Sequence, residues 1–126
     1  MRTVTFLLLA TVALTGCTNK DEVYKKKILP LYDSLARIRD DIHDGIVSSG
    51  FSADCDAATT LHEKAQHDLS GEDEARTSFV NMQNALEGYI ALRSIASQAT
   101  PDKITLMAKG AAADLEKAHA ALEKGD

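Results

Sequence analysis

The sequence predicts an all-α protein, an antiparallel up-down bundle of four helices that follows a cleaved signal peptide. Apolar residues recur every three or four positions in four stretches, which is the spacing of one face of an α-helix. Aromatic residues make up only 5% of the chain, and the few glycines and prolines lie mostly between these stretches or at their ends. Four amphipathic helices joined by short links pack most economically as an antiparallel bundle.

The first helix is expected over residues 21–48. Its apolar stripe consists of Tyr24, Ile28, Leu31, Leu35, Ile38, Ile42 and Ile46. Pro30 lies inside the stripe and removes one backbone hydrogen bond, but the stripe keeps its phase across it, so we predict one kinked helix. The segment 45–50 should end this helix, with Gly50 as a left-handed cap or a turn residue.

The second helix is expected over residues 53–69, with Ser52 or Asp54 as its cap. Its stripe is the weakest of the four and consists of Cys55, Ala58, Leu61, Ala65 and Leu69. The following segment, residues 70–73, reads Ser-Gly-Glu-Asp and predicts a turn and a capping box. Its acidic residues would complement the positive end of the next helix.

The third and fourth helices are expected over residues 72–98 and 101–124. The inward positions of the third are Ala75, Phe79, Met82, Leu86, Tyr89 or Ile90, and Ala96. The fourth has the clearest start in the chain, because Thr100 can cap it, Pro101 suits its first position and Asp102 lies at its positive end. Its stripe consists of Ile104, Ala108, Ala111, Leu115, Ala118 and Leu122, and the alanines allow close approach of helices.

The N-terminal segment has the character of an export signal. The apolar run 4–14 is too short for a membrane span, which needs about 20 residues. Arg2, the apolar run and the small residues after it are typical of a signal peptide. The four residues Leu14-Thr15-Gly16-Cys17 resemble the lipobox of bacterial lipoproteins. This resemblance implies cleavage after Gly16, a diacylglycerol on the Cys17 thiol and acylation of the new amino group.

These features divide the chain into a signal peptide (1–16), a lipidated tether (17–22) and a helical domain (23–126). Two or three acyl chains, such as palmitate, give a lasting anchor, so we expect a membrane-attached protein of the cell envelope. If the host has two membranes, Thr18, in place of the Asp that retains many lipoproteins in the inner membrane, favours the outer membrane, facing the periplasm. Lys20 and Lys25–Lys27 either contact anionic head groups or form a solvated helix face.

Charge and cysteine content narrow the functional classes. Loss of Arg2 with the signal leaves 13 basic and 19 acidic residues, a net charge of −6, which argues against nucleic-acid binding. Lipidation of Cys17 leaves Cys55 without a partner in its own chain. Asp54 and Asp56 flank Cys55 and disfavour its thiolate, so we interpret it as a small buried residue.

The sequence offers no catalytic, cofactor-binding or metal-binding set, because phosphate loops, Cys-x-x-Cys and His-Glu-x-x-His motifs are all missing. The histidines are His43, His62, His67 and His119. Glu116 with His119 and Asp40 with His43 match the spacing of di-iron bundles, but Glu116 and Asp40 lie off the apolar stripes. Glu63 and His67 are read as a solvated pair.

The layout is also superficially similar to that of four-helix cytochromes, which hold haem between a Met on the first helix and a His on the last. His119 could be the second ligand, but the expected first helix has no Met. The sequence therefore favours a non-enzymatic lipoprotein whose bundle binds another envelope component or an envelope protein. The alternative is a periplasmic carrier of a small apolar ligand, haem or metal.

Overall fold

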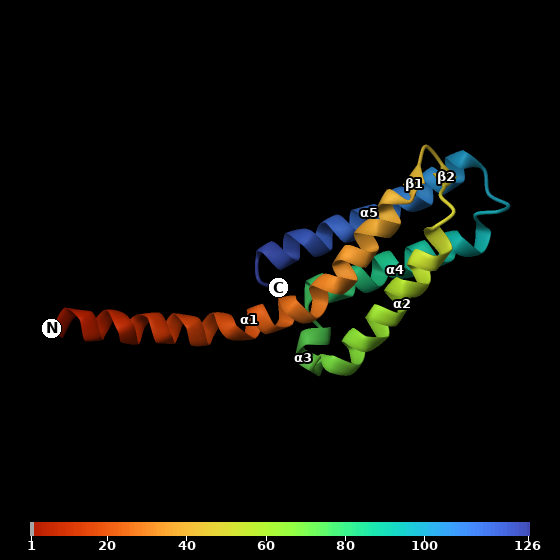
Figure 1. Ribbon diagram of the computed structural model, residues 1–126. Coiled ribbons are helices and arrows are strands. Elements are labelled where there is room, and N and C mark those ends of the chain that lie inside the picture. The colour runs from red at the N-terminus through yellow and green to blue at the C-terminus, as the bar shows by residue number, and fades with distance from the viewer. Residues whose placement is uncertain (1) are drawn as a thin grey trace.

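The computed structural model describes the course of the chain from residue 2 to residue 126 and the side chains of residues 20–126. The protein is mostly helical, as the all-α prediction requires. In order, the elements are α1 (Arg2–Asp40), β1 (Ile42–His43), β2 (Ile46–Val47), α2 (Phe51–Asp68), α3 (Gly71–Glu74), α4 (Thr77–Ile95) and α5 (Pro101–Glu123) (Figure 1).

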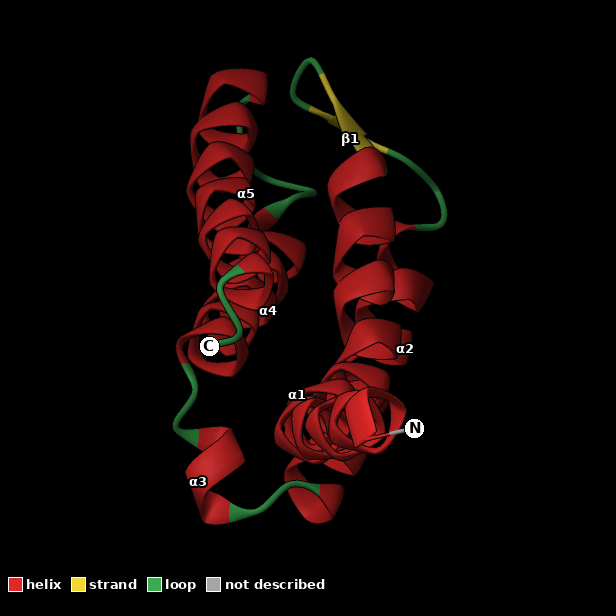
Figure 2. Cartoon of the chain, turned by 90° about the vertical axis from the view of Figure 1, so that its left-hand side faces the viewer, coloured by secondary structure: helices red, strands yellow, loops and turns green. Residues whose placement is uncertain are grey.

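The long helices pack as two pairs. Helix α1 lies along α2 and helix α4 lies along α5, and Figure 2 shows the two pairs side by side. Helix α1 also contacts α4 and α5, and α2 also contacts α4, so the core lies between the pairs. The largest fully buried side chains come from all four helices and include Tyr24, Leu35, Cys55, Phe79 and Leu115.

Helix α1 ends eight residues earlier than the stripe predicts, at Asp40 instead of residue 48. The chain then forms a two-stranded antiparallel hairpin, in which Ile42 pairs with Val47 and His43 with Ile46. Asp44 and Gly45 form its turn with φ values of 53° and 75°. Two positive φ values in succession define a type I′ hairpin turn, for which Asp-Gly is a preferred sequence. The assignment of Ile42 and Ile46 to the helix was therefore wrong.

Two further features of this region differ from the expectation or extend it. Gly50 lies in a turn and is the N-cap of α2 with φ −84°, so it is the turn residue of the prediction and not the left-handed cap, and Gly45 adopts the left-handed conformation. Pro30 lies within α1, which continues past it as one helix. Figure 1 shows that α1 changes direction along its orange part.

Helix α2 begins at Phe51, before both predicted caps, because the buried Phe51 side chain extends its apolar face by one turn. The expected third helix is divided into α3 and α4, since Arg76 has extended backbone (φ −63°, ψ 142°). Ala75 is consequently exposed rather than inward. The predicted cap at Ser70 is confirmed, because its hydroxyl accepts a hydrogen bond from Asp73 N at 3.2 Å.

Helix α5 matches the prediction to within one residue. The Thr100 hydroxyl accepts a hydrogen bond from Lys103 N at 3.2 Å, and Pro101 occupies the first turn. Most of the predicted stripe is buried, and Ala108 is partly buried against it. A Cβ atom on Gly88 of α4 would lie 3.1 Å from Cβ of Ala111, so small residues do let α4 and α5 approach closely.

Candidate functional site

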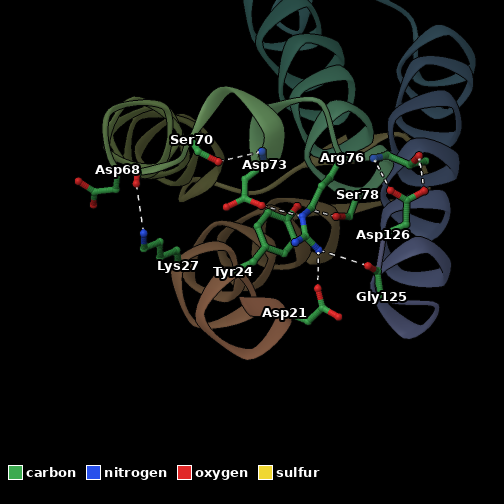
Figure 3. Close-up of polar contacts among 11 residues, drawn as sticks. Asp21, Tyr24, Lys27, Asp68, Ser70, Asp73, Arg76, Ser78, Gly125 and Asp126 are labelled. Carbon is green, nitrogen blue, oxygen red and sulfur yellow. Dashed lines mark hydrogen bonds and ion pairs between the residues drawn. The ribbon is translucent and has the colours of Figure 1, made fainter. Parts of the chain in front are cut away.

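Figure 3 shows a polar cluster centred on Arg76. It includes Asp21, which lies in the part of α1 that leads back toward residue 17. The guanidinium donates through Nε to Asp73 Oδ1 at 2.8 Å, and through Nη1 to Asp21 Oδ1 at 3.1 Å and to the Gly125 carbonyl at 3.2 Å. Because Arg76 has extended backbone between α3 and α4, its side chain reaches α1, α3 and the segment after α5. One residue therefore joins segments from distant parts of the sequence.

Tyr24 is the aromatic member of the cluster, and the guanidinium of Arg76 lies over its ring. Arg76 Cζ lies 4.3 Å from the centre of the Tyr24 ring, a cation–π geometry. The Tyr24 hydroxyl is 2.6 Å from Ser78 Oγ, and burial raises the pKa of the phenol. Tyr24 is 1% exposed, so its ring and its hydroxyl both belong to the core. Ser78, which is also buried, leaves room for the phenol and gives it a partner.

Tyr89 is as deeply buried as Tyr24. Its hydroxyl has no hydrogen-bond partner among the described residues. Burial raises the pKa of this phenol to about 12. The hydroxyl therefore stays protonated at any physiological pH.

A carboxylate beside the N-terminus of α4 extends the Arg76 cluster. Asp126 accepts hydrogen bonds from Thr77 N at 3.3 Å and from Thr77 Oγ1 at 2.7 Å. These two bonds lower the pKa of Asp126. A negative group near the first backbone N–H groups of a helix also complements its dipole.

The cluster links separate segments of the same chain through Arg76. Asp21, Asp73 and the Gly125 carbonyl all bond to Arg76, so this guanidinium is already engaged by the protein itself. The sequence pattern does not reveal this cluster, because it places Arg76 in the first turns of a continuous helix over residues 72–98. The one local signal was the Ser70–Asp73 cap, since a turn there places Asp73 within reach of residue 76.

The predicted lipidation and cleavage residues, Cys17 and Gly16, lie outside the described side chains. Cys55 is free and 0% exposed, so its interpretation as a small buried residue is confirmed. Burial raises the pKa of the Cys55 thiol to about 11, with Asp56, Asp41 and Asp54 adding to the effect. The thiol is therefore protonated and shielded at neutral pH.

The four histidines do not come together. His62 stacks on Phe79, with ring centres 5.5 Å apart, and burial lowers its pKa. His43 lies on the hairpin and is exposed. Within residues 20–126, no group of three or more His, Cys, Asp or Glu side chains has an arrangement that could hold a metal ion.

His67 and His119 contact residues other than the ones that their sequence motifs suggest. His67 Nδ1 lies 3.3 Å from Asp68 Oδ1, so the expected pairing with Glu63 was wrong. His119 Nδ1 lies 3.5 Å from Glu123 Oε1, and its ring centre is 5.7 Å from that of Tyr32. Both imidazoles lie on the surface.

The hairpin end holds a second group of polar atoms. Asp41 follows α1 directly, and its Oδ2 is buried without a hydrogen-bond partner in the part of the chain that the structure describes. Burial and the neighbouring Asp54 carboxyl raise the pKa of Asp41 to about 6. At the same end, Ile46 and Leu106 are 68% and 71% exposed, respectively.

Comparison of the chain with protein-family models, curated proteins and solved structures gives no match. Among the described residues, no helix combines the length and the apolar character that crossing a membrane requires. A functional assignment therefore rests on the residues and their geometry.

Proposed function

We propose that this protein is a membrane-anchored, non-enzymatic envelope lipoprotein whose helical domain binds another envelope component or an envelope protein. The lipobox-like residues Leu14–Cys17 support the anchor. The observation that carries the proposal is the bond between Arg76 and Asp21, because Asp21 follows Cys17 by only four residues. Four residues span at most about 14 Å, so the acyl chains on Cys17 would hold the folded domain close to the bilayer.

In this proposal, residues 1–16 are removed and residues 17–22 form the tether. The domain is an antiparallel up-down bundle of α1, α2, α4 and α5. Each of these helices contacts at least two of the others, which supports the bundle. The absence of an Asp after Cys17 favours the outer membrane, facing the periplasm, in a host with two membranes.

The hairpin end is the proposed contact surface for the partner. Ile46 projects from β2, and Leu106 lies in the N-terminal part of α5, whose Pro101 packs against Gly45 of the hairpin. The hairpin and the N-terminal part of α5 lie away from α3 and the C-terminus (Figure 1). Ile46 and Leu106 are the two most exposed large apolar side chains among the described residues, and covering such surface with a partner is favourable.

The anchor is tested by palmitate labelling and membrane fractionation after a carbonate wash. Cys17→Ser should abolish labelling and leave the signal peptide attached. Cys55→Ser is the matched control and should be labelled and processed as the wild type is. If Cys17→Ser is still labelled or still processed at Gly16, the lipoprotein assignment is wrong.

The partner surface is tested by a photo-crosslinking residue placed at Ile46 or Leu106 in the native envelope, followed by mass spectrometry. The control position is Lys117, which is exposed in the C-terminal half of α5. We expect one discrete envelope component to be captured from both apolar positions and not from Lys117. The same mixture of neighbours at all three positions would contradict a binding surface at the hairpin end.

A further inference from the structure

One flank of α1 carries basic residues and no acidic ones. At about 100° per residue, the exposed residues of this flank form a continuous strip beside the buried stripe. This strip, called the basic flank below, consists of Lys20, Val23, Lys26, Lys27, Pro30 and Arg37. Glu22, Asp33 and Asp40 lie on the outer face of α1, next to the basic flank, and the other flank mixes Asp21 with Lys25 and Arg39. The basic flank itself holds no carboxylate, in a chain of net charge −5.

The basic flank borders a groove between α1 and α2. The groove has a volume of about 230 Å³. Lys26 and Lys27 line it from α1 and Lys64 lines it from α2, while Leu31 and Leu61 are among its apolar lining residues. The groove thus combines three ammonium groups with apolar walls, which suits an anion that carries hydrocarbon.

The lysines of the groove are not neutralised by carboxylates. Within residues 20–126, every ion pair of the protein involves an arginine or a histidine, and none involves a lysine. Asp68 is the acidic residue of the groove lining, and its carboxylate lies 3.3 Å from His67. Lys27 Nζ donates to the Asp68 backbone carbonyl at 3.2 Å, which leaves two further N–H donors on that ammonium.

The distance between Cys17 and Lys26 determines which orientation of the domain brings the basic flank to the bilayer. Lys26 follows Cys17 by nine residues on α1, a rise of about 14 Å along a helix. Charges are screened beyond about 8 Å at physiological ionic strength. An upright α1 would therefore hold Lys26 too far from the lipid phosphates. With the basic flank turned toward the bilayer, Lys20, Lys26 and Lys27 all come within that range.

We propose that the basic flank and the adjoining groove bind the anionic phospholipid head groups of the bilayer in which Cys17 is anchored. The ammonium groups of Lys26, Lys27 and Lys64 contact the phosphate, and the apolar walls contact the glycerol. This inference rests on the proposed function, because the anchor supplies the bilayer. The domain then lies on its side with α4 and α5, the other helix pair in Figure 2, turned away from the lipid.

The test is an amine-acetylation footprint of the full chain, purified from an exporting host and reconstituted into vesicles. One set of vesicles is phosphatidylcholine alone, and the other contains one third phosphatidylglycerol. We expect acetylation of Lys20, Lys26, Lys27 and Lys64 to fall at least about fivefold on the anionic vesicles. The exposed lysines of α5, Lys103, Lys109 and Lys117, should be modified equally on both.

A pair of matched variants separates the basic flank from charge in general. In Lys26→Gln/Lys27→Gln/Lys64→Gln, Lys20 remains as a reporter and should lose its protection on anionic vesicles. In Lys103→Gln/Lys109→Gln/Lys117→Gln, which removes the same charge from α5, Lys20 should stay protected. All of the changed residues are exposed, and circular dichroism checks that both variants are folded.

Three results would overturn the proposal. Equal protection on both vesicle types would show that anionic lipid is not recognised. Loss of Lys20 protection in both variants would show that only net charge matters. Protection of the same lysines by inorganic phosphate in detergent would identify a free anion as the ligand. The mass of the reconstituted chain reports acylation of Cys17 separately, and an unacylated chain that still sediments with anionic vesicles would disprove the anchor and support the basic flank.

Discussion

The two ends of the helical domain are held together in different ways. At the anchor end, side chains make the connections, because Arg76 bonds to Asp21, Asp73 and Gly125 and covers the ring of Tyr24. At the hairpin end, backbone conformation makes the connection, through the tight turn at Asp44 and Gly45. Ion pairs and hydrogen bonds between side chains therefore hold the end near the proposed membrane together, whereas the conformation of a backbone turn defines the proposed partner end.

The largest expected effect tests the hairpin end. Gly45→Ala should destabilise the protein by about 3 kcal/mol, because φ is +75° there and a Cβ atom would collide with Pro101. Thermal or urea unfolding measures the loss. Gly110→Ala is the control, since residue 110 lies within α5 and has open space around its Cα, so it should gain up to about 1 kcal/mol. Equal stabilities of the two variants would refute the tight turn.

The next effect tests the anchor end. Arg76→Ala should destabilise the protein by about 2 kcal/mol, because it leaves Asp21 and Asp73 unpaired and uncovers Tyr24. Urea unfolding at low and high salt measures this loss, which should be smaller at high salt because salt screens the exposed part of the network. Arg37→Ala, an exposed position on α1, should change stability by less than about 0.5 kcal/mol.

The smallest expected effect on stability depends on pH and comes from Asp41 at the hairpin end. The folded-state pKa of Asp41 is about 6, above its ordinary value of 3.8, so the native state binds more protons than the unfolded state in this range. The resulting penalty is absent below about pH 3.8 and fully present above about pH 6. Asp41→Asn should therefore stabilise the protein by about 1 kcal/mol above pH 7, after allowance for solvent screening, and have little effect near pH 4.

Unfolding curves at the two pH values check this prediction, with Asp33→Asn as the control on the exposed surface of α1. A benefit of Asp41→Asn that is the same at both pH values would mean that carboxylate ionisation is not its cause. If the hairpin end is also the partner surface, the crosslinking yield at Ile46 should be unchanged in this variant.

Sequence patterns predict the parts of this fold that local chemistry determines. Thr100 and Pro101 define the start of α5, and the buried positions of α5 follow from helical spacing. The same spacing fails at Ile42 and Ile46, because their separation of four residues fits a helix as well as it fits two paired strands. The Asp44-Gly45 turn decides between them, and apolar periodicity carries no information about positive φ.

The Arg76 cluster escapes sequence reasoning for another reason. Its contacts with Asp21 and Gly125 join residues 55 and 49 positions away in the sequence. A local pattern extends over about one or two dozen residues, so it cannot pair such positions. The basic flank can be predicted in part. Its lysines can be read from the sequence, but the groove beside them depends on the packing of α1 against α2.

The long reach of Arg76 also has a consequence for the timing of folding. Asp21 and Gly125 are 104 positions apart in the sequence, and both must reach Arg76 before its network is complete. Contacts between such distant positions form late, because the loop between them must close first. In a chain that crosses a membrane N-terminus first, this network closes only after the last helix has emerged. The anchor end would then become rigid at the moment when secretion is finished.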